Sequence, residues 1–280
     1  MHFCDRILVD RLCFQRALGS IYLIAFLIAA NQFIALLGER GLQPVRLFVR
    51  QIPFRRAPSL FYINCSDRFI TATIWFGIAL SIFAITGLSE SFGLGVSMLT
   101  WALLWMIYLS LVNVGRTFYG FGWETMLAET GFLAIFLGSC DTRPPVVVMW
   151  LILWLLFRTM FSAGMIKVRA DPCWRDFTCL FYHYETQPLP NPLSWYLHHA
   201  PRWFHKAGIF FNHFAELIVP WFYFAPAPLC YWAGAITILF QITLILSGNL
   251  SWLNYITIVL CIPCFDDSLS FSILRIATSL

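Results

Sequence analysis

The chain has 280 residues and a net charge of +4, and its composition excludes most soluble classes of protein. Hydrophobic residues make up 60% and charged residues 11%, against roughly 45–50% and about 25% in soluble globular domains. So few charges could not cover the surface of a soluble fold. The composition therefore predicts a polytopic membrane protein. It excludes a disordered chain, a coiled coil, a disulfide-stapled secreted domain and a nucleic-acid binder.

Apolar runs long enough to cross a bilayer recur along the chain, since a spanning helix needs about 20 mostly apolar residues. Their length and uniformity favour helices over barrel strands. The sequence predicts an all-α polytopic transmembrane helix bundle with about seven to eight spans. The first run is too long for a cleavable signal peptide and is expected to stay as an anchor. The expected spans are 17–38, 69–88, 93–113, 121–139, 145–165, 207–224, 229–247 and 252–265, the last being short.

Two long connections interrupt these runs, and the basic residues lie mainly beside apolar segments, where they meet anionic head groups. The expected segments are a flank at 1–16, helices one to five at 17–165 with an arginine-rich loop at 39–68, an aromatic and proline-rich loop at 166–206, helices six to eight at 207–265 and a tail at 266–280. Counting basic residues by the positive-inside rule places both long loops in the cytoplasm. Long loops weigh little in that rule, and three N-terminal arginines point the other way.

Five ionisable residues fall inside expected spans, where a charge costs roughly 2.5–3.5 kcal/mol at the bilayer centre. They are Glu124, Glu129, Arg158, His213 and Glu216. Two interpretations stay open. One is a set of buried ion pairs that fix helix register, for example Arg158 with Glu124 or Glu129. The other is a polar cavity for a substrate, a proton or a client segment. His213 and Glu216 are three residues apart and so share a helical face.

The second long loop mixes aromatic residues with charges and ends in a proline-rich run, 187–192, that favours polyproline II geometry. It is too long and too mixed in chemistry for a plain connection. It is either an interfacial cap that stabilises the bundle or a recognition surface. The residues expected to form the recognition surface are Trp174, Arg175, Asp176, Tyr182, His183, Tyr184, Glu185, Gln187, Pro188, Pro190 and Trp195.

Other patterns lack the context that would give them a function. Cys261 and Cys264 have redox spacing but lie in an apolar run without a strand–helix context. The nine cysteines are odd in number and irregularly spaced, and predict no disulfide framework. The cysteines and histidines match no zinc spacing, so neither a metal nor a cofactor is expected. Asn64-Cys65-Ser66 is a glycosylation sequon only if the first loop faces a secretory lumen.

Four stretches of sequence carry a family resemblance. They are GERGLQP at 38–44, FYGFGWE at 118–124 running into ETGFLAIF at 129–136, WRDFTCLFYHYETQPLP at 174–190, and GNLSWLNY at 248–255. The third is the most specific, because so long an ordered string rarely arises by chance. Together they resemble the lipase maturation factor family, and the resemblance extends over nearly the whole chain, to about residue 267.

The resemblance implies a multi-spanning membrane protein that helps client lipases to reach an active, assembled state, without an enzymatic reaction of its own. It implies the endoplasmic reticulum membrane in animals and the inner membrane in bacteria. It also places the second long loop on the lumenal side, against the charge count. Client lipases and the lipid bilayer are the expected partners. The family continues into a C-terminal region, so this chain is expected to be a truncated form or fragment.

The family's membrane part is also distantly similar to that of the vitamin K-dependent gamma-carboxylase, in which a lysine after a glycine-containing helix end acts as base. The segment 163–167 has a similar shape, although a snorkelling helix terminus is the simpler interpretation of Lys167. Three alternatives stay open beside the maturation factor. They are a carboxylase-like enzyme using Lys167 with His213 and Glu216, a transporter lined by the intramembrane polar residues, and an inactive fragment. The lack of an internal repeat disfavours the transporter.

Overall fold

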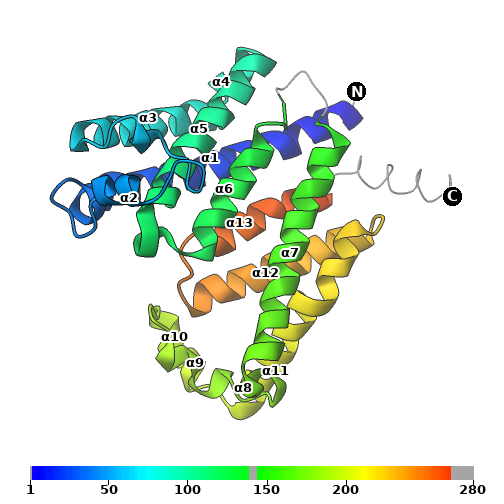
Figure 1. Ribbon diagram of the computed structural model, residues 1–280. Coiled ribbons are helices and arrows are strands. Elements are labelled where there is room, and N and C mark those ends of the chain that lie inside the picture. The colour runs from blue at the N-terminus through cyan, green and yellow to red at the C-terminus, as the bar shows by residue number, and fades with distance from the viewer. Residues whose placement is uncertain (1, 139–143, 266–280) are drawn as a thin grey trace. The chain divides into compact units, whose positions relative to one another are not determined.

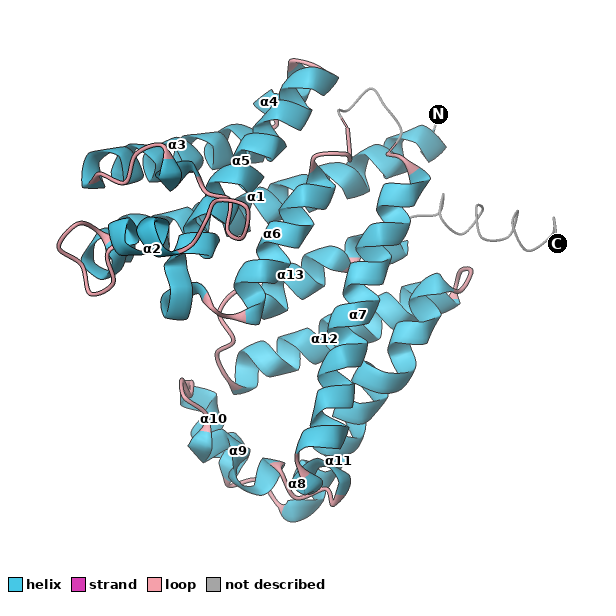
Figure 2. Cartoon of the chain, in the orientation of Figure 1, coloured by secondary structure: helices cyan, strands magenta, loops and turns pink. Residues whose placement is uncertain are grey.

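The computed structural model describes residues 2–138 and 144–265, with side chains from residue 11 onward. All regular secondary structure in these residues is helical, which confirms the predicted all-α polytopic bundle (Figure 2). The expected tail at 266–280 lies outside the described residues. The chain forms two compact units. The first unit is Arg11–Val148, and the second unit is Met1–Asp10 with Met149–Leu280.

Within residues 2–138 and 144–265, five helices are long and apolar enough to cross a membrane. Each lies at an expected span and contains no proline, so nothing interrupts its hydrogen-bond ladder. They are α1 (His2–Leu37), α3 (Asp67–Ile85), α5 (Leu94–Gly115), α7 (Val146–Ala170) and α12 (Leu229–Ser247) (Figure 1). The chain is therefore an integral, multi-pass membrane protein.

The other three expected spans hold shorter or broken helices. The expected fourth span contains α6, and the expected sixth is split where Pro220 lacks a backbone N–H. The expected eighth ends in a short turn that contains Pro263. The elements are α6 (Gly122–Ala134), α11 (Arg202–His213) with a π-turn η3 (Phe214–Ile218) and a 3-10 turn η4 (Val219–Phe224), and α13 (Leu253–Leu260) with η5 (Ile262–Phe265).

In the first unit, the segment that contains α6 runs from one end of the unit to the other despite its length. After Ala134 the chain tightens into turns with i to i−3 hydrogen bonds, for example Leu137 N to Ala134 O at 3.2 Å. At the far end, Gln15 Nε2 and Ser97 Oγ both donate to Gly138 O at 3.3 Å. Ser97 lies in the first turn of α5 and Gln15 in the first half of α1, so the chain contacts both helices after α6.

The core of the first unit is rich in aromatic side chains. The Tyr22 ring lies edge-on to Trp101 and Tyr108, at centroid distances of 6.2 and 5.4 Å. The Tyr22 hydroxyl donates to Leu127 O at 3.2 Å, which fixes α6 against α1. Short helices join the long ones: α2 (Val45–Gln51), η1 (Leu60–Tyr62), α4 (Leu88–Ser91) and η2 (Arg116–Tyr119).

In the second unit, most of the second long loop is helical. Residues 171–201, called the helical loop here, contain α8 (Pro172–Arg175), α9 (Leu180–Thr186) and α10 (Pro192–His198). Asp171 and Asn191 cap α8 and α10 with their side chains, each before a proline in the first helical turn. Gln187, which starts the proline-rich run, has φ −67° and ψ 142°, within polyproline II geometry.

The helical loop contains a disulfide bond between Cys173 and Cys179, so the prediction of no disulfide was wrong for this pair. Its physical basis is a tight turn after α8. Thr178 N and Cys179 N both donate to Cys173 O, at 2.9 and 3.2 Å, and Phe177 adopts a positive φ of 58°. An odd count of cysteines does not reveal such a local turn.

Candidate functional site

The helical loop is fastened to the C-terminal end of α12 by polar side chains. Gln187 Nε2 and Ser194 Oγ donate to Ser247 O at 3.0 and 2.8 Å. Asn191 Nδ2 donates to Leu246 O at 2.9 Å and to Ile245 O at 3.1 Å. The last four carbonyls of an α-helix have no partner within the helix. The loop therefore supplies the cap of α12, and α12 fixes the position of the loop.

This contact joins the two stretches of sequence at 174–190 and 248–255. Gly248 lies where they meet, and a Cβ atom built on it would overlap Oε1 of Gln187. Gln187 cannot move aside without loss, because its Nε2 also donates to Tyr184 O at 3.2 Å and to Ser194 Oγ at 2.9 Å. A glycine is needed at 248 for space.

Gly248→Ala is therefore expected to destabilise the second unit by about 1–3 kcal/mol, the usual range for overpacking a filled site. The matched control is Gly95→Ala in α5, where a Cβ meets nothing within 4 Å. That variant is expected to be neutral or slightly stabilising, because alanine favours a helix over glycine. The measurement is the unfolding midpoint of the purified protein in mixed detergent. Equal midpoints for both variants would contradict the packing argument.

Lys167 near the end of α7 contacts residues of α8, α11, η3 and α12. Lys167 Nζ donates to Glu216 Oε1 at 2.6 Å and to Asn212 Oδ1 at 3.1 Å. It also lies 5.0 Å from the ring centroid of Trp174 and 5.9 Å from that of Phe240. Glu216 has only 3% of its side chain exposed. The ammonium of Lys167 contacts these protein partners, while the interpretation of Lys167 as a snorkelling helix terminus stays a prediction.

Two of the other predicted intramembrane residues, His213 and Glu124, make the following contacts. His213 Nε2 lies 3.0 Å from Trp174 O, so His213 and Glu216 serve different contacts. Glu124 is buried and accepts hydrogen bonds from Tyr108 and from Trp123 Nε1. Glu129 and Arg158 have exposed side chains on α6 and α7. A polar cavity lined by these residues stays a prediction.

Some of the predicted recognition residues are exposed, and the others are buried or partly buried. Tyr184 is only 9% exposed and its ring lies 5.9 Å from that of His205. Trp174 and Gln187 are partly buried in the contacts described above. The exposed set comprises Arg175, Asp176, Tyr182, His183, Glu185, Pro188, Pro190 and Trp195.

Several exposed apolar residues were missed by the sequence analysis. With Tyr182 and Trp195 they are exposed apolar side chains of α9, α10, the turn between them and the start of α11. We refer to this set as the aromatic face: Tyr182, Leu189, Leu193, Trp195, Tyr196 and Trp203. Trp195 and Trp203 are 63% and 70% exposed. Trp203 lies on α11, outside the stretch 174–190 that carries the resemblance. A helical periodicity count over α10 and α11 is the signal that could have identified it.

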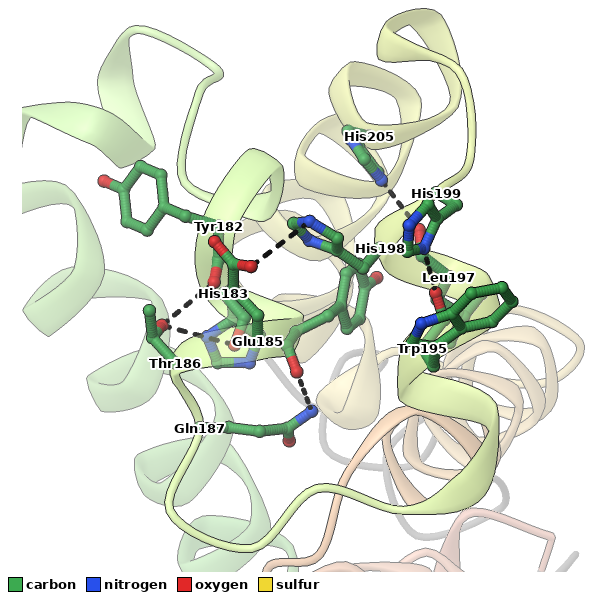
Figure 3. A network of polar contacts seen from close by, with 11 residues as sticks. Tyr182, His183, Glu185, Thr186, Gln187, Trp195, Leu197, His198, His199 and His205 are labelled. Carbon is green, nitrogen blue, oxygen red and sulfur yellow. Dashed lines mark hydrogen bonds and ion pairs between the residues drawn. The ribbon is translucent and has the colours of Figure 1, made fainter.

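Side-chain contacts join α9, α10 and α11, as Figure 3 shows. Glu185 Oε2 on α9 lies 3.4 Å from His198 Nε2 on α10. His205 Nε2 on α11 lies 2.8 Å from Leu197 O, and His199 Nδ1 lies 2.8 Å from Trp195 O. These contacts fix the helices that carry the aromatic face.

Desolvation and the nearby Lys167 ammonium lower the pKa of His183, which favours its neutral form at pH 7.

The cysteines offer little chemistry in this arrangement. Asp171, Cys173 and Cys179 lie close enough together to surround a metal ion. However, the two sulfurs are joined to each other, and Asp171 Oδ1 accepts from Cys173 N at 2.9 Å. Cys261 and Cys264 are free thiols buried in the second unit, and Cys261 Sγ lies 3.2 Å from Thr257 O. A redox role for that pair gains no support.

Comparisons with known proteins test the resemblance. The chain matches the lipase maturation factor transmembrane domain over residues 9–271. It is 44% identical to lipase maturation factor 1 of Homo sapiens over 284 residues, which cover 93% of this chain and 49% of that protein. The identity is also 44%, over 282 residues, with lipase maturation factor 1 of Bos taurus, with the same coverage.

With lipase maturation factor 2 of Xenopus laevis the identity is 34% over 281 residues, which cover 92% of this chain and 39% of that protein. The chain thus spans about half the length of the lipase maturation factor 1 relatives. No solved structure matches it. The four stretches of sequence are confirmed as a family resemblance, and the chain belongs to the lipase maturation factor family.

Proposed function

We propose that this chain is a membrane-embedded maturation factor that assists the folding and assembly of client lipases, and that its aromatic face binds them. The observation that carries the proposal is a group of exposed aromatic side chains on the helical loop and at the start of α11, with the loop hydrogen-bonded to the end of α12. Exposed apolar groups on a fixed scaffold are typical of protein-binding surfaces, and Trp and Tyr dominate the energy of such contacts.

The mechanism is coverage of apolar surface in the client. A lipase that is not yet assembled exposes apolar segments that aggregate. Trp195 and Trp203 present large apolar rings with a polar N–H, and aromatic rings of this kind bind apolar surface at a low entropic cost. Transient binding lowers the concentration of aggregating segments without a chemical reaction. The family name of the relatives supports lipases as the clients.

We place the helical loop on the lumenal side of the endoplasmic reticulum membrane in a eukaryote, or the periplasmic side of the inner membrane in a bacterium. The disulfide between Cys173 and Cys179 supports this side, because disulfides persist in oxidising compartments. The disulfide and the family resemblance agree with each other. We give them more weight than the positive-inside count, because long loops contribute little to that rule.

The test is the specific activity of a lipase, meaning its activity per unit of lipase mass. A lipase is expressed in cells that lack their own maturation factor, with or without this chain, and the chain is confirmed in the membrane. A rise in specific activity without a rise in lipase mass is the expected result. No change with several lipases would contradict the proposal and leave the chain as an inactive part of a longer factor.

A further inference from the structure

A strongly basic surface lies in the first unit, whereas the aromatic face belongs to the second unit. It is formed by the segment 39–56, between α1 and η1. We call it the basic surface, and its exposed guanidinium groups belong to Arg40, Arg46, Arg50, Arg55 and Arg56. In the part of the chain that the structure describes, none of the five is in an ion pair.

The one acidic residue of this segment, Glu39, and the next acidic residue along the chain, Asp67, make hydrogen bonds to each other's backbone. Asp67 Oδ1 accepts from Glu39 N at 2.7 Å, and Glu39 Oε1 accepts from Asp67 N at 3.4 Å. Each carboxylate is therefore directed to backbone amide groups where α1 ends and α3 begins. Among the described residues, neither carboxylate forms an ion pair with these five guanidinium groups.

The basic surface adjoins the ends of two membrane-crossing helices. Gln43 N donates to Leu36 O at 2.9 Å, so the chain turns back directly onto the end of α1. On α2, Gln51 Oε1 accepts from Arg116 Nη2 at 3.1 Å, and the Phe48 ring lies 5.1 Å from the Arg116 guanidinium carbon. Arg116 directly follows α5. Because α1 and α5 cross the membrane, α2 lies at the boundary between lipid and water.

Helix α2 is amphipathic in the manner of an interfacial helix. Val45 and Phe48 are buried against the unit. Arg46 and Arg50 are four residues apart and so share a face, which is exposed together with Leu47. A short distance along the chain, Phe54 is also exposed. Helices at a membrane surface insert such apolar side chains at the acyl boundary while their basic groups contact lipid phosphates.

We propose that the basic surface binds anionic phospholipid head groups, with Arg46 and Arg50 on phosphate oxygens and Leu47 and Phe54 at the head-group boundary. Charge complementarity and continuity with α1 and α5 both favour lipid. The planar guanidinium group presents paired N–H donors that fit phosphate oxygens. An acidic protein segment would match the charge. Such a segment would not explain why the basic surface lies at the bilayer boundary or why Leu47 and Phe54 are exposed.

The experiment measures which lipid the purified chain retains. The protein, in a neutral detergent, is mixed with phosphatidylglycerol and phosphatidylcholine of identical acyl chains at equal concentration, and native mass spectrometry gives the ratio of bound lipids. We expect wild type to favour phosphatidylglycerol. Arg46→Gln with Arg50→Gln is expected to reduce that ratio by about fivefold for each charge removed. Both side chains are exposed, so the folded structure is expected to persist, with an unchanged unfolding midpoint.

The matched control is Arg175→Gln with Lys206→Gln, which removes two exposed charges from the second unit. Its lipid ratio is expected to equal that of wild type. The proposal is overturned if wild type shows no preference, if the Arg46 and Arg50 variant keeps it, or if the control loses as much. Displacement of phosphatidylglycerol by an equal concentration of a decaglutamate peptide would assign the surface to an acidic protein partner and also overturn the proposal.

Discussion

Lys167→Ala is expected to destabilise the second unit by about 3–5 kcal/mol, the cost of leaving one partner of a buried ion pair unpaired. The carboxylate of Glu216 is almost fully buried and lies 2.6 Å from the Lys167 ammonium. Without that ammonium, Glu216 keeps no opposite charge among its described contacts. Trp174 and Asn212 also lose the contact that fixes them to α7. The unfolding midpoint in mixed detergent measures the change.

The control for Lys167→Ala is Lys206→Ala, which removes the other lysine of the chain from an exposed site. It is expected to change stability by less than about 0.5 kcal/mol. A second variant, Lys167→Met with Glu216→Leu, replaces the pair by apolar groups and is expected to recover most of the loss, since such replacements are often neutral. A loss from Lys167→Ala no larger than that from Lys206→Ala would contradict the structural role.

Lys167→Arg separates this role from the carboxylase-like alternative. Arginine keeps the positive charge, so the ion pair with Glu216 and most of the stability are expected to remain. A catalytic base at this position would be lost, because arginine stays protonated. Retained lipase maturation by Lys167→Arg is the outcome expected for a positioning lysine. Loss of maturation at full stability would favour the enzyme.

The long spans could be predicted from the sequence because the signal is local. Each of the five long helices is a proline-free apolar run, and lipid permits only helices there. Pro220 and Pro263 are local indications that the sixth and eighth spans are broken, but a prediction from apolar length alone does not take proline into account. For α6, the return of the chain to Gln15 and Ser97 could not be predicted, since it depends on contacts far apart in sequence.

The candidate site was predictable in position but not in the roles of its residues. Composition identified the loop, and most of its selected residues are exposed. Burial of Tyr184 and the contact of Trp174 with Lys167 depend on how the loop folds back, which composition does not contain. Lys167 and Glu216 are 49 residues apart, so their pairing is visible only in three dimensions. The same holds for the cap that Gln187 and Asn191 provide to α12.

Trp195→Ala with Trp203→Ala is expected to weaken client binding by about tenfold or more, because removal of central aromatic contacts commonly costs 2 kcal/mol or more. Lipase specific activity should fall several-fold at unchanged abundance of the chain. Abundance should hold because both indole rings are mainly exposed. The readout is lipase activity and mass in cells that depend on this chain, with the chain quantified in the membrane.

Two controls decide what the aromatic face does. Trp232→Ala removes an equally exposed tryptophan, 66% exposed, from the membrane-crossing α12, and is expected to leave lipase activity unchanged. Trp174→Ala and Tyr184→Ala remove packed rings, so they are expected to lower abundance and activity together. If the Trp195 and Trp203 variant instead lowers abundance with constant lipase activity per unit of chain, the face is an interfacial cap. The client would then have to bind elsewhere, because an anchor in the bilayer boundary stabilises the protein without contacting the lipase.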